Sequence, residues 1–181
     1  AHKLLTFENG VKWKSSIFLK NTDIIAIPKT IDMKKEKKIT KEDAFFLGLF
    51  VAEGTNNPLS ITTSNEKLKD FLVDYTSKKF NYLPKVKKRK NVYLILFRKR
   101  TREFLGELAN CRAGTKFIPN IIFSSPQEIK QEFLKGYLTG DGYFTSRTIE
   151  LSTKSEKLAT QLSYLLKTLG INCTCLLYTS P

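Results

Sequence analysis

The sequence predicts an α+β fold built from two related αββαββα units that pack through one helix each. Two observations carry this prediction: a nine-residue motif occurs twice, and a second block recurs downstream of each copy. The motifs are Phe46-Leu-Gly-Leu-Phe-Val-Ala-Glu-Gly54 and Leu134-Lys-Gly-Tyr-Leu-Thr-Gly-Asp-Gly142, at an offset of 88 residues. Aligned blocks in the same order indicate an internal structural repeat.

The downstream blocks extend the repeat beyond the motif. Ile61-Thr-Thr-Ser-Asn-Glu-Lys-Leu68 matches Leu151-Ser-Thr-Lys-Ser-Glu-Lys-Leu158 at an offset of 90 residues. The second copy therefore has two more residues between its motif and its block. We expect the same secondary structure in both copies.

Each motif predicts a helix that ends at its last glycine, the usual helix stop. Short strand-turn-strand segments follow at residues 55–63 and 143–153. A second helix then starts in each unit with a capping box, Thr63 with Glu66 and Thr153 with Glu156. Apolar stripes mark these helices: Leu68, Phe71, Leu72 and Tyr75 in the first, and Leu158, Leu162, Leu165 and Leu169 in the second.

The first unit continues with strands at residues 84–88 and 92–98 and a closing helix at about 101–109. The second unit stops a strand and a helix short, so we expect an incomplete unit with an unpaired strand edge near residues 173–178 and a partly exposed leucine stripe. The predicted domains are residues 1–40, a β fragment with a basic linker at 34–38; residues 41–125, the first unit; and residues 126–181, the second.

Composition narrows the class of protein. Hydrophobic residues make up 41% of the 181 residues, which is enough for a packed core, and the net charge of +14 favours a polyanionic partner such as nucleic acid. A ribosomal or membrane-surface protein is the alternative on charge alone. The longest apolar stretch, residues 44–52, is too short for the ~20 residues of a membrane span. Three cysteines without framework spacing predict a reduced, intracellular protein, cytoplasmic or nucleoid-associated.

Small residues recur four apart on the motif helices, at Gly48 and Ala52 and at Gly136 and Gly140. Glycine inside a helix costs ~1 kcal/mol relative to alanine, so close helix packing is the expected reason. We therefore expect the two motif helices to pack together about a pseudo-two-fold axis.

That packing places Glu53 and Asp141 side by side, each at a helix C-terminus. An acid there opposes the helix dipole, and two adjacent carboxylates repel each other. A divalent cation, Mg²⁺ or Mn²⁺, would remove both penalties. The alternative is that each acid is only the last exposed residue before a glycine cap.

Basic residues of the predicted strands form a candidate DNA surface, because a twisted β-ribbon can enter the major groove. The candidates are Lys85, Lys87, Arg89, Arg98, Arg100, Arg147 and Lys154. An ordinary basic sheet face is the alternative interpretation.

The two motifs resemble the signature motifs of the LAGLIDADG homing endonucleases in the single-chain form, over roughly residues 41–178. The resemblance implies a monomer with internal pseudo-symmetry, whose saddle-shaped sheets grip double-stranded DNA. It also implies that Glu53 and Asp141 bind Mg²⁺, and that Lys116 of Lys116-Phe-Ile-Pro119 assists catalysis. Glu53 stands where aspartate is commoner, and Val51 and Thr139 replace the middle acid of the motif.

The N-terminus resembles part of an intein splicing domain, in Ala1-His-Lys-Leu-Leu-Thr6 and Asn21-Thr-Asp-Ile-Ile-Ala-Ile-Pro28. The resemblance makes His2 the splicing-block histidine. The first-residue nucleophile and the terminal His-Asn pair of inteins are absent, so we expect no splicing by this chain.

These features predict a metal-dependent endonuclease that hydrolyses phosphodiester bonds of double-stranded DNA at a specific site. The alternative on the same fold is a catalytically inactive nucleic-acid-binding remnant or an RNA maturase. A basic structural protein of a ribonucleoprotein is a third class, which two acids meeting at a close helix pair argue against.

Overall fold

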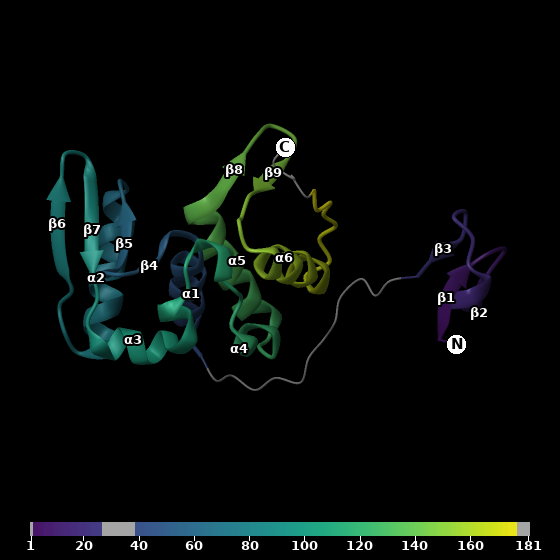
Figure 1. Ribbon diagram of the computed structural model, residues 1–181, viewed down its shortest axis with the longest axis horizontal. Helices are drawn as coiled ribbons and strands as arrows, with labels where there is room; N and C mark the ends of the chain where they lie inside the picture. Colours follow the sequence, from purple (N-terminus) through teal and green to yellow (C-terminus); the bar gives the residue numbers. More distant parts are fainter. Residues whose placement is uncertain (1, 27–38, 177–181) are drawn as a thin grey trace.

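The computed structural model describes residues 2–26 and 39–176 (Figure 1). The basic run at residues 34–38 lies outside this part of the chain. The described chain forms three antiparallel sheets, with strand orders β2-β1-β3, β4-β5-β7-β6 and β8-β9. It therefore has the mixed α+β architecture that the repeat predicts.

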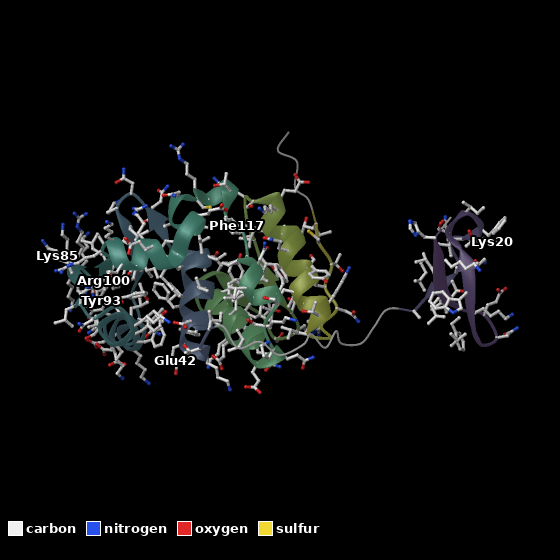
Figure 2. The ribbon with its side chains drawn as sticks, turned by 90° about the horizontal axis from the view of Figure 1, so that it is seen from below. Lys20, Glu42, Lys85, Tyr93, Arg100 and Phe117 are labelled. Atoms are coloured by element: carbon white, nitrogen blue, oxygen red, sulfur yellow. The ribbon has the colours of Figure 1, made fainter. Side chains whose placement is uncertain are left out.

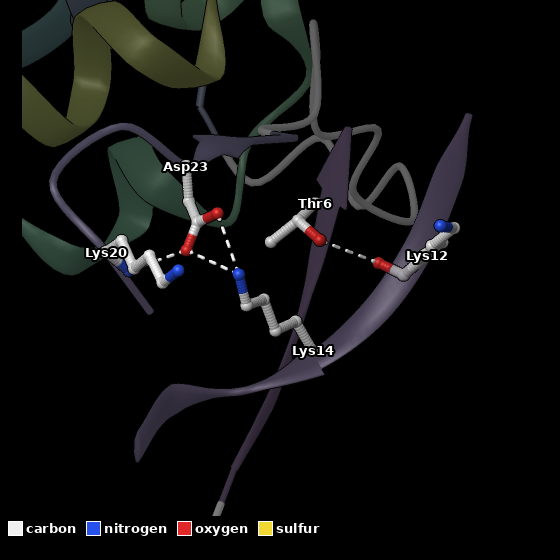
Figure 3. Close-up of polar contacts among 5 residues, drawn as sticks. All are labelled: Thr6, Lys12, Lys14, Lys20 and Asp23. Carbon is white, nitrogen blue, oxygen red and sulfur yellow. Dashed lines mark hydrogen bonds and ion pairs between the residues drawn. The ribbon is translucent and has the colours of Figure 1, made fainter. Parts of the chain in front are cut away.

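The first sheet lies in the N-terminal segment and consists of β1 (Lys3–Phe7), β2 (Val11–Ser15) and β3 (Ile24–Ile25), with the short 3-10 helix η1 (Ser16–Phe18) after β2. Lys14 Nζ donates to both carboxylate oxygens of Asp23, over 2.8 and 2.9 Å, and this ion pair ties β2 to the turn before β3 (Figure 3). Hydrogen bonds from Lys14 and from the Lys20 amide lower the pKa of Asp23. The sheet is thus fixed by a local ion pair rather than by a large core.

The first half contains α1 (Lys41–Glu53), β4 (Thr55–Asn56), β5 (Leu59–Thr63), α2 (Glu66–Phe80), β6 (Lys85–Arg89), β7 (Val92–Leu96) and α3 (Lys99–Leu105). The order αββαββα is the predicted one. The closing helix is shorter than the sequence indicates, because Gly106 has a φ of 55° and the chain continues as the 3-10 helix η2 (Gly106–Asn110).

The second half contains α5 (Gln127–Asp141), β8 (Gly142–Phe144), β9 (Ile149–Leu151) and α6 (Glu156–Thr168). The 3-10 helix η3 (Ala113–Thr115) and the short helix α4 (Asn120–Phe123) connect the halves. Within the described residues this half has two strands where the first half has four.

The two motif helices, α1 and α5, lie side by side at the centre of residues 39–176, with one sheet on each side (Figure 1). Their packing is symmetric. A Cβ atom on Gly48 would overlap the Phe133 carbonyl oxygen, and one on Gly136 would overlap the carbonyl oxygen of Phe45, the counterpart of Phe133. Since only glycine allows backbones this close, the halves are joined by direct backbone contact along the axis.

The core continues from α1 into the first half. Phe46 is fully buried and stacks on Tyr75 of α2 at 4.8 Å between ring centroids. Ile61 of β5 and Ile95 of β7 face each other across the strand pair and are fully buried. The helices therefore cover one face of the β4-β5-β7-β6 sheet and leave its other face open.

The predicted capping boxes at Thr63 and Thr153 are wrong. The caps are Asn65 and Ser155, whose side chains accept from the backbone N–H groups of Leu68 and Leu158. Thr63 Oγ1 and Thr153 Oγ1 instead accept from the N–H groups of the caps themselves. Each threonine therefore stabilises the turn before its helix, and the helix starts later than the pattern indicates.

The expected exposure of the α6 leucine stripe is also wrong. Leu158, Leu162 and Leu165 are buried and Leu169 is half-buried. Ile118 and Ile122 of the connecting segment are fully buried in the same hydrophobic core as these leucines. The described residues 171–176 form no strand, so among the described residues β8 and β9 each have one unpaired edge. Residues 177 and 178 of the predicted edge lie outside the described part of the chain.

Candidate functional site

The C-termini of α1 and α5 meet, and each ends in an acid, Glu53 and Asp141. Gly140 makes the approach possible. A Cβ atom at that position would lie 2.5 Å from Ala52 Cβ and 2.9 Å from Glu53 Cγ. The two small residues that precede the acids are therefore in direct contact, and this brings the two carboxylates to one place.

The electrostatics of the pair are unfavourable without a cation. Burial raises the pKa of Glu53, and the charge of Asp141 raises it further. Burial also raises the pKa of Asp141, although its side chain is the more exposed of the two. Both carboxylates also sit at the negative ends of helix dipoles. The site consequently favours a positive charge.

Lys116 supplies one positive charge. It lies in the irregular segment between η3 and α4, and its Nζ donates to the carbonyl oxygen of Ala52 over 2.7 Å. The ammonium lowers the pKa of both Glu53 and Asp141. Burial lowers the pKa of Lys116 itself, although the negative charges of Asp141 and Glu53 act in the opposite direction. The structure thus brings the three predicted catalytic residues together.

The residues present fit a divalent cation of the Mg²⁺ type. Such an ion is usually held by one or two carboxylates, with waters and substrate phosphates completing its shell. Glu53 and Asp141 provide two neighbouring carboxylates, and burial raises the pKa of each. Within residues 2–26 and 39–176, no cluster of three or more His, Cys, Asp or Glu side chains suits a metal. A fully protein-built cage is therefore not present in that part of the chain.

Tyr137 lies on α5 one turn before Asp141, and it was not predicted from the sequence. Its side chain is fully buried, and its hydroxyl has no hydrogen-bond partner among the described residues. Burial raises its pKa, and the charge of Asp141 raises it further. One feature of the sequence could have drawn attention to Tyr137: it corresponds in the repeat to the apolar Leu49 of the first motif.

The basic candidates on β6 share one face of the sheet. Val86 lies opposite the buried Ile95 in the β6–β7 register, so it points toward the helices. Lys85, Lys87 and Arg89 alternate with it and therefore point to the open face. All three are exposed.

The other basic candidates are dispersed. Arg98 and Arg100 follow the end of β7, so their assignment to a strand is wrong. Arg98 lies over the Tyr82 ring at 5.3 Å, and Arg100 Nη1 donates to the Phe80 carbonyl oxygen over 2.9 Å, which occupies Arg100 at the end of α2. Figure 2 shows Arg100 and Lys85 at the same end of the first half. Arg147 lies in the β8–β9 turn and Lys154 just before α6, both exposed.

His2 lies at the start of the N-terminal sheet, where its carbonyl oxygen accepts from the Ser16 amide over 2.8 Å. Its side chain is exposed. The described residues place no acid or nucleophile in hydrogen-bonding distance of it, so its proposed splicing role stays a prediction.

Comparisons with known proteins give matches in sequence and in fold. Residues 128–176 match a family of LAGLIDADG-like domains. The chain is 32% identical to an A-type ATP synthase component of Pyrococcus abyssi, over 94% of this chain and 20% of that protein. It is 33% identical to a DNA polymerase of Thermococcus litoralis, over 75% of this chain and 8% of the polymerase. The chain thus spans about a fifth or less of the curated relatives it matches.

Among solved structures, the homing endonuclease I-DmoI in complex with DNA and Mn matches with a TM-score of 0.55 and 17% identity, covering 74% of this chain and 80% of that one. An I-DmoI variant with its target DNA and Mg matches equally, with a TM-score of 0.55 and 16% identity over the same shares. The chain therefore has the fold of a LAGLIDADG homing endonuclease. Among the described helices, none combines the length and apolarity that crossing a bilayer requires.

Proposed function

We propose that this chain is the endonuclease region of an intein and cleaves double-stranded DNA at a specific site with a divalent metal. The observation that carries the proposal is the meeting of Glu53 and Asp141 at the C-termini of the two motif helices, with Lys116 beside them. A site of this kind on the axis of a pseudo-symmetric protein can address both strands of a pseudo-symmetric duplex.

Glu53 and Asp141 would hold Mg²⁺ or Mn²⁺, which when bound supplies charge stabilisation at the phosphate and lowers the pKa of a bound water. The residues of the chain perform the remaining tasks. The Lys116 ammonium can donate a hydrogen bond to a non-bridging phosphate oxygen as negative charge develops there. Because burial lowers the pKa of Lys116, the same amine is also closer to releasing a proton near neutral pH than an ordinary lysine.

The open face of β4-β5-β7-β6 would contact the DNA through Lys85, Lys87 and Arg89, and Arg147 would do so from the β8–β9 turn. Basic side chains on phosphates position the duplex. The kinds of protein that the chain matches support the intein origin. An ATP synthase component and a DNA polymerase share no activity, yet each matches this chain over a small part of its length, as expected for an inserted element.

The test is the substitution Asp141→Asn, which keeps the shape of the side chain and removes its charge. We expect it to abolish cleavage of a cognate duplex in Mg²⁺ and to leave the Kd for DNA in Ca²⁺ or EDTA largely unchanged. Glu128→Gln is the matched control, since this exposed acid lies at the opposite end of the same helix. Cleavage by Asp141→Asn at the wild-type rate would reject the assignment.

The second candidate is a nucleic-acid binder without nuclease activity, such as an RNA maturase. The net charge of +14 and the exposed β6 residues favour binding independently of the acid pair. Salt-sensitive binding of a duplex without metal-dependent nicking by the wild type would favour this candidate. A preference for structured RNA over duplex DNA would identify the maturase form.

A further inference from the structure

The segment that carries Lys116 is held by α6, a helix to which the proposed function assigns no task. Ser155 Oγ donates to the carbonyl oxygen of Lys116 over 2.7 Å. The Ile118 N–H donates to Gln161 Oε1 over 2.8 Å, and Gln161 Nε2 donates back to the Ile118 carbonyl oxygen over 3.4 Å. A side-chain amide has both donor and acceptor groups, so one glutamine satisfies both backbone groups of Ile118.

The internal repeat shows that these contacts are particular to the second half. At the offset of 90 residues, Gln161 corresponds to Phe71, which packs against the Phe45 ring at 4.9 Å and the Tyr75 ring at 5.8 Å. Both positions are half-buried. The first half fills this position with an aromatic ring, and the second with an amide whose burial is offset by its hydrogen bonds.

The same comparison applies to the helix caps. Asn65 and Ser155 correspond at the offset of 90, and both side chains accept from the backbone of their own helix. Ser155 is 1% exposed and also donates to Lys116, a contact for which the described structure shows no counterpart at Asn65. The N-cap residue of α6 therefore contacts the Lys116 segment in addition to capping its own helix.

Through these contacts Lys116 is hydrogen-bonded to both halves of the protein. Its Nζ is bonded to Ala52 of α1, while its own backbone and that of Ile118 are bonded to α6. Between them, Phe117 lies under the Lys157 ammonium at 4.7 Å, a third contact with α6. The position of the Lys116 ammonium beside the two acids thus depends on α6 as much as on α1.

We propose that Gln161 and Ser155 are positioning residues for Lys116: they fix its backbone so that its ammonium stays against the last turn of α1. The catalytic consequence rests on the proposed function, in which Lys116 acts on the phosphate. The positioning itself can be tested without any cleavage.

The first experiment uses Gln161→Met, which keeps the side-chain length and removes both hydrogen bonds. We expect the single-turnover cleavage rate at saturating protein to fall by about 10- to 100-fold, the usual effect of losing a residue that orients a catalytic group. The Kd for DNA should not change, because Gln161 contacts Ile118 rather than the open sheet face. Gln161→Glu keeps an acceptor for the Ile118 N–H but places a second carboxylate oxygen near the Ile118 carbonyl oxygen, so it should recover only part of the rate. Gln131→Met, at an exposed glutamine of α5, should have no effect.

The second experiment is independent of activity and uses the metal-free protein. In Gln161→Met the Ile118 amide should exchange with solvent at least about 10-fold faster, as expected for the loss of one hydrogen bond. The NMR signal of the Lys116 ammonium should broaden. Wild-type behaviour of both probes, or a wild-type single-turnover rate, overturns the proposal. If the wild type cuts no DNA, the proposed function fails, while the two probes still decide whether Gln161 positions Lys116.

Ser155→Ala and Asn65→Ala form a matched pair, since each removes a helix cap and only the first removes a contact with Lys116. Slower cleavage in Ser155→Ala alone is the expected result. Equal slowing in both would assign the effect to the lost cap and exclude Ser155 as a positioning residue.

Discussion

Asp43 is a buried acid that serves stability rather than the candidate site. It is 1% exposed at the first turn of α1, where it accepts from the Tyr75 hydroxyl over 2.8 Å, from Lys79 Nζ over 2.9 Å and from the Thr40 amide over 3.0 Å. Burial alone would raise its pKa, but these hydrogen bonds together lower the pKa below its ordinary value. Asp43 therefore ties α1 to α2 in its charged form.

We expect Asp43→Asn to lower the free energy of unfolding by about 1.5–3 kcal/mol at pH 7, the range for hydrogen bonds to a charged group. Because the folded pKa is depressed, the contribution of the carboxylate is complete above its unfolded pKa and is lost as the pH falls through the folded value. The difference from wild type in urea unfolding should accordingly shrink below about pH 3.8. Asp74→Asn, which removes an exposed pair with Lys78, should change stability by under about 0.5 kcal/mol.

The residues of the site were predictable to different extents. The repeat alone predicted that Glu53 and Asp141 come together, because symmetry relates their helices. Gln161 carried no comparable signal, because it is one polar residue of an amphipathic helix and its partner Ile118 lies 43 residues away in sequence. The glycine-spaced pattern of α5 gave no sign that the Tyr137 hydroxyl would be buried. The hydrogen bond between Lys116 and Ala52 depends on the path of an irregular segment, which periodicity cannot predict.

At the scale of the element, α1 and α5 depend on glycines at their contact. In Gly48→Ala the new methyl group would overlap the backbone of α5 at Phe133 and Tyr137. Backbone cannot move aside as a flexible side chain can, so we expect a loss of at least about 1–3 kcal/mol in the free energy of unfolding. Gly136→Ala should cost a similar amount by symmetry.

Gly114→Ala is the matched control for this pair, because a Cβ atom at Gly114 would meet no atom within 4 Å. Chemical unfolding of the three variants tests the prediction. If Gly48→Ala were as stable as Gly114→Ala, the two helices could not be in backbone contact in solution.

Strand β6 should contribute strongly to the salt dependence of DNA binding. The log of the DNA affinity falls with the log of the salt concentration by about 0.9 per phosphate neutralised. Replacing Lys85, Lys87 and Arg89 together by glutamine should therefore reduce the slope by up to about 2.7. Replacing the exposed helix residues Lys67, Lys78 and Lys99 by glutamine removes the same three charges and should leave the slope nearly unchanged. An equal effect of both sets would assign binding to charge alone rather than to the open sheet face.

The elements themselves show where sequence patterns succeed. Helices α1, α2 and α6 and the strands of the first half are predicted by apolar periodicity and glycine stops. Helix starts were missed by two residues, since Thr63 and Asn65 both offer a side-chain oxygen and only the tertiary turn decides between them. Helix α4, with four residues, is too short to show a period and is stabilised by burial of Ile122.

At the scale of the whole molecule, the described halves offer unequal surfaces to a duplex. The first presents a four-stranded sheet with a basic edge strand, and the second a two-stranded ribbon with Arg147 at its turn. We expect footprinting with this chain to show longer protection on the side of the cut that the first half covers. Protection of equal length on both sides would contradict this expectation.

The glycine-mediated contact between α1 and α5 has a consequence for how such a protein can change its target. Glu53 and Asp141 are the last residues of α1 and α5. The position of their carboxylates is therefore set by a contact between helix backbones that leaves no room for a Cβ atom at the glycines. The outward-facing side chains of β6 are exposed, so replacing them does not disturb the packing of the core. Under the proposed function, substitutions on β6 can change the recognised DNA sequence without disturbing the acid pair on the axis. Retargeting by design should therefore begin on β6 and leave Gly48, Ala52, Gly136 and Gly140 unchanged.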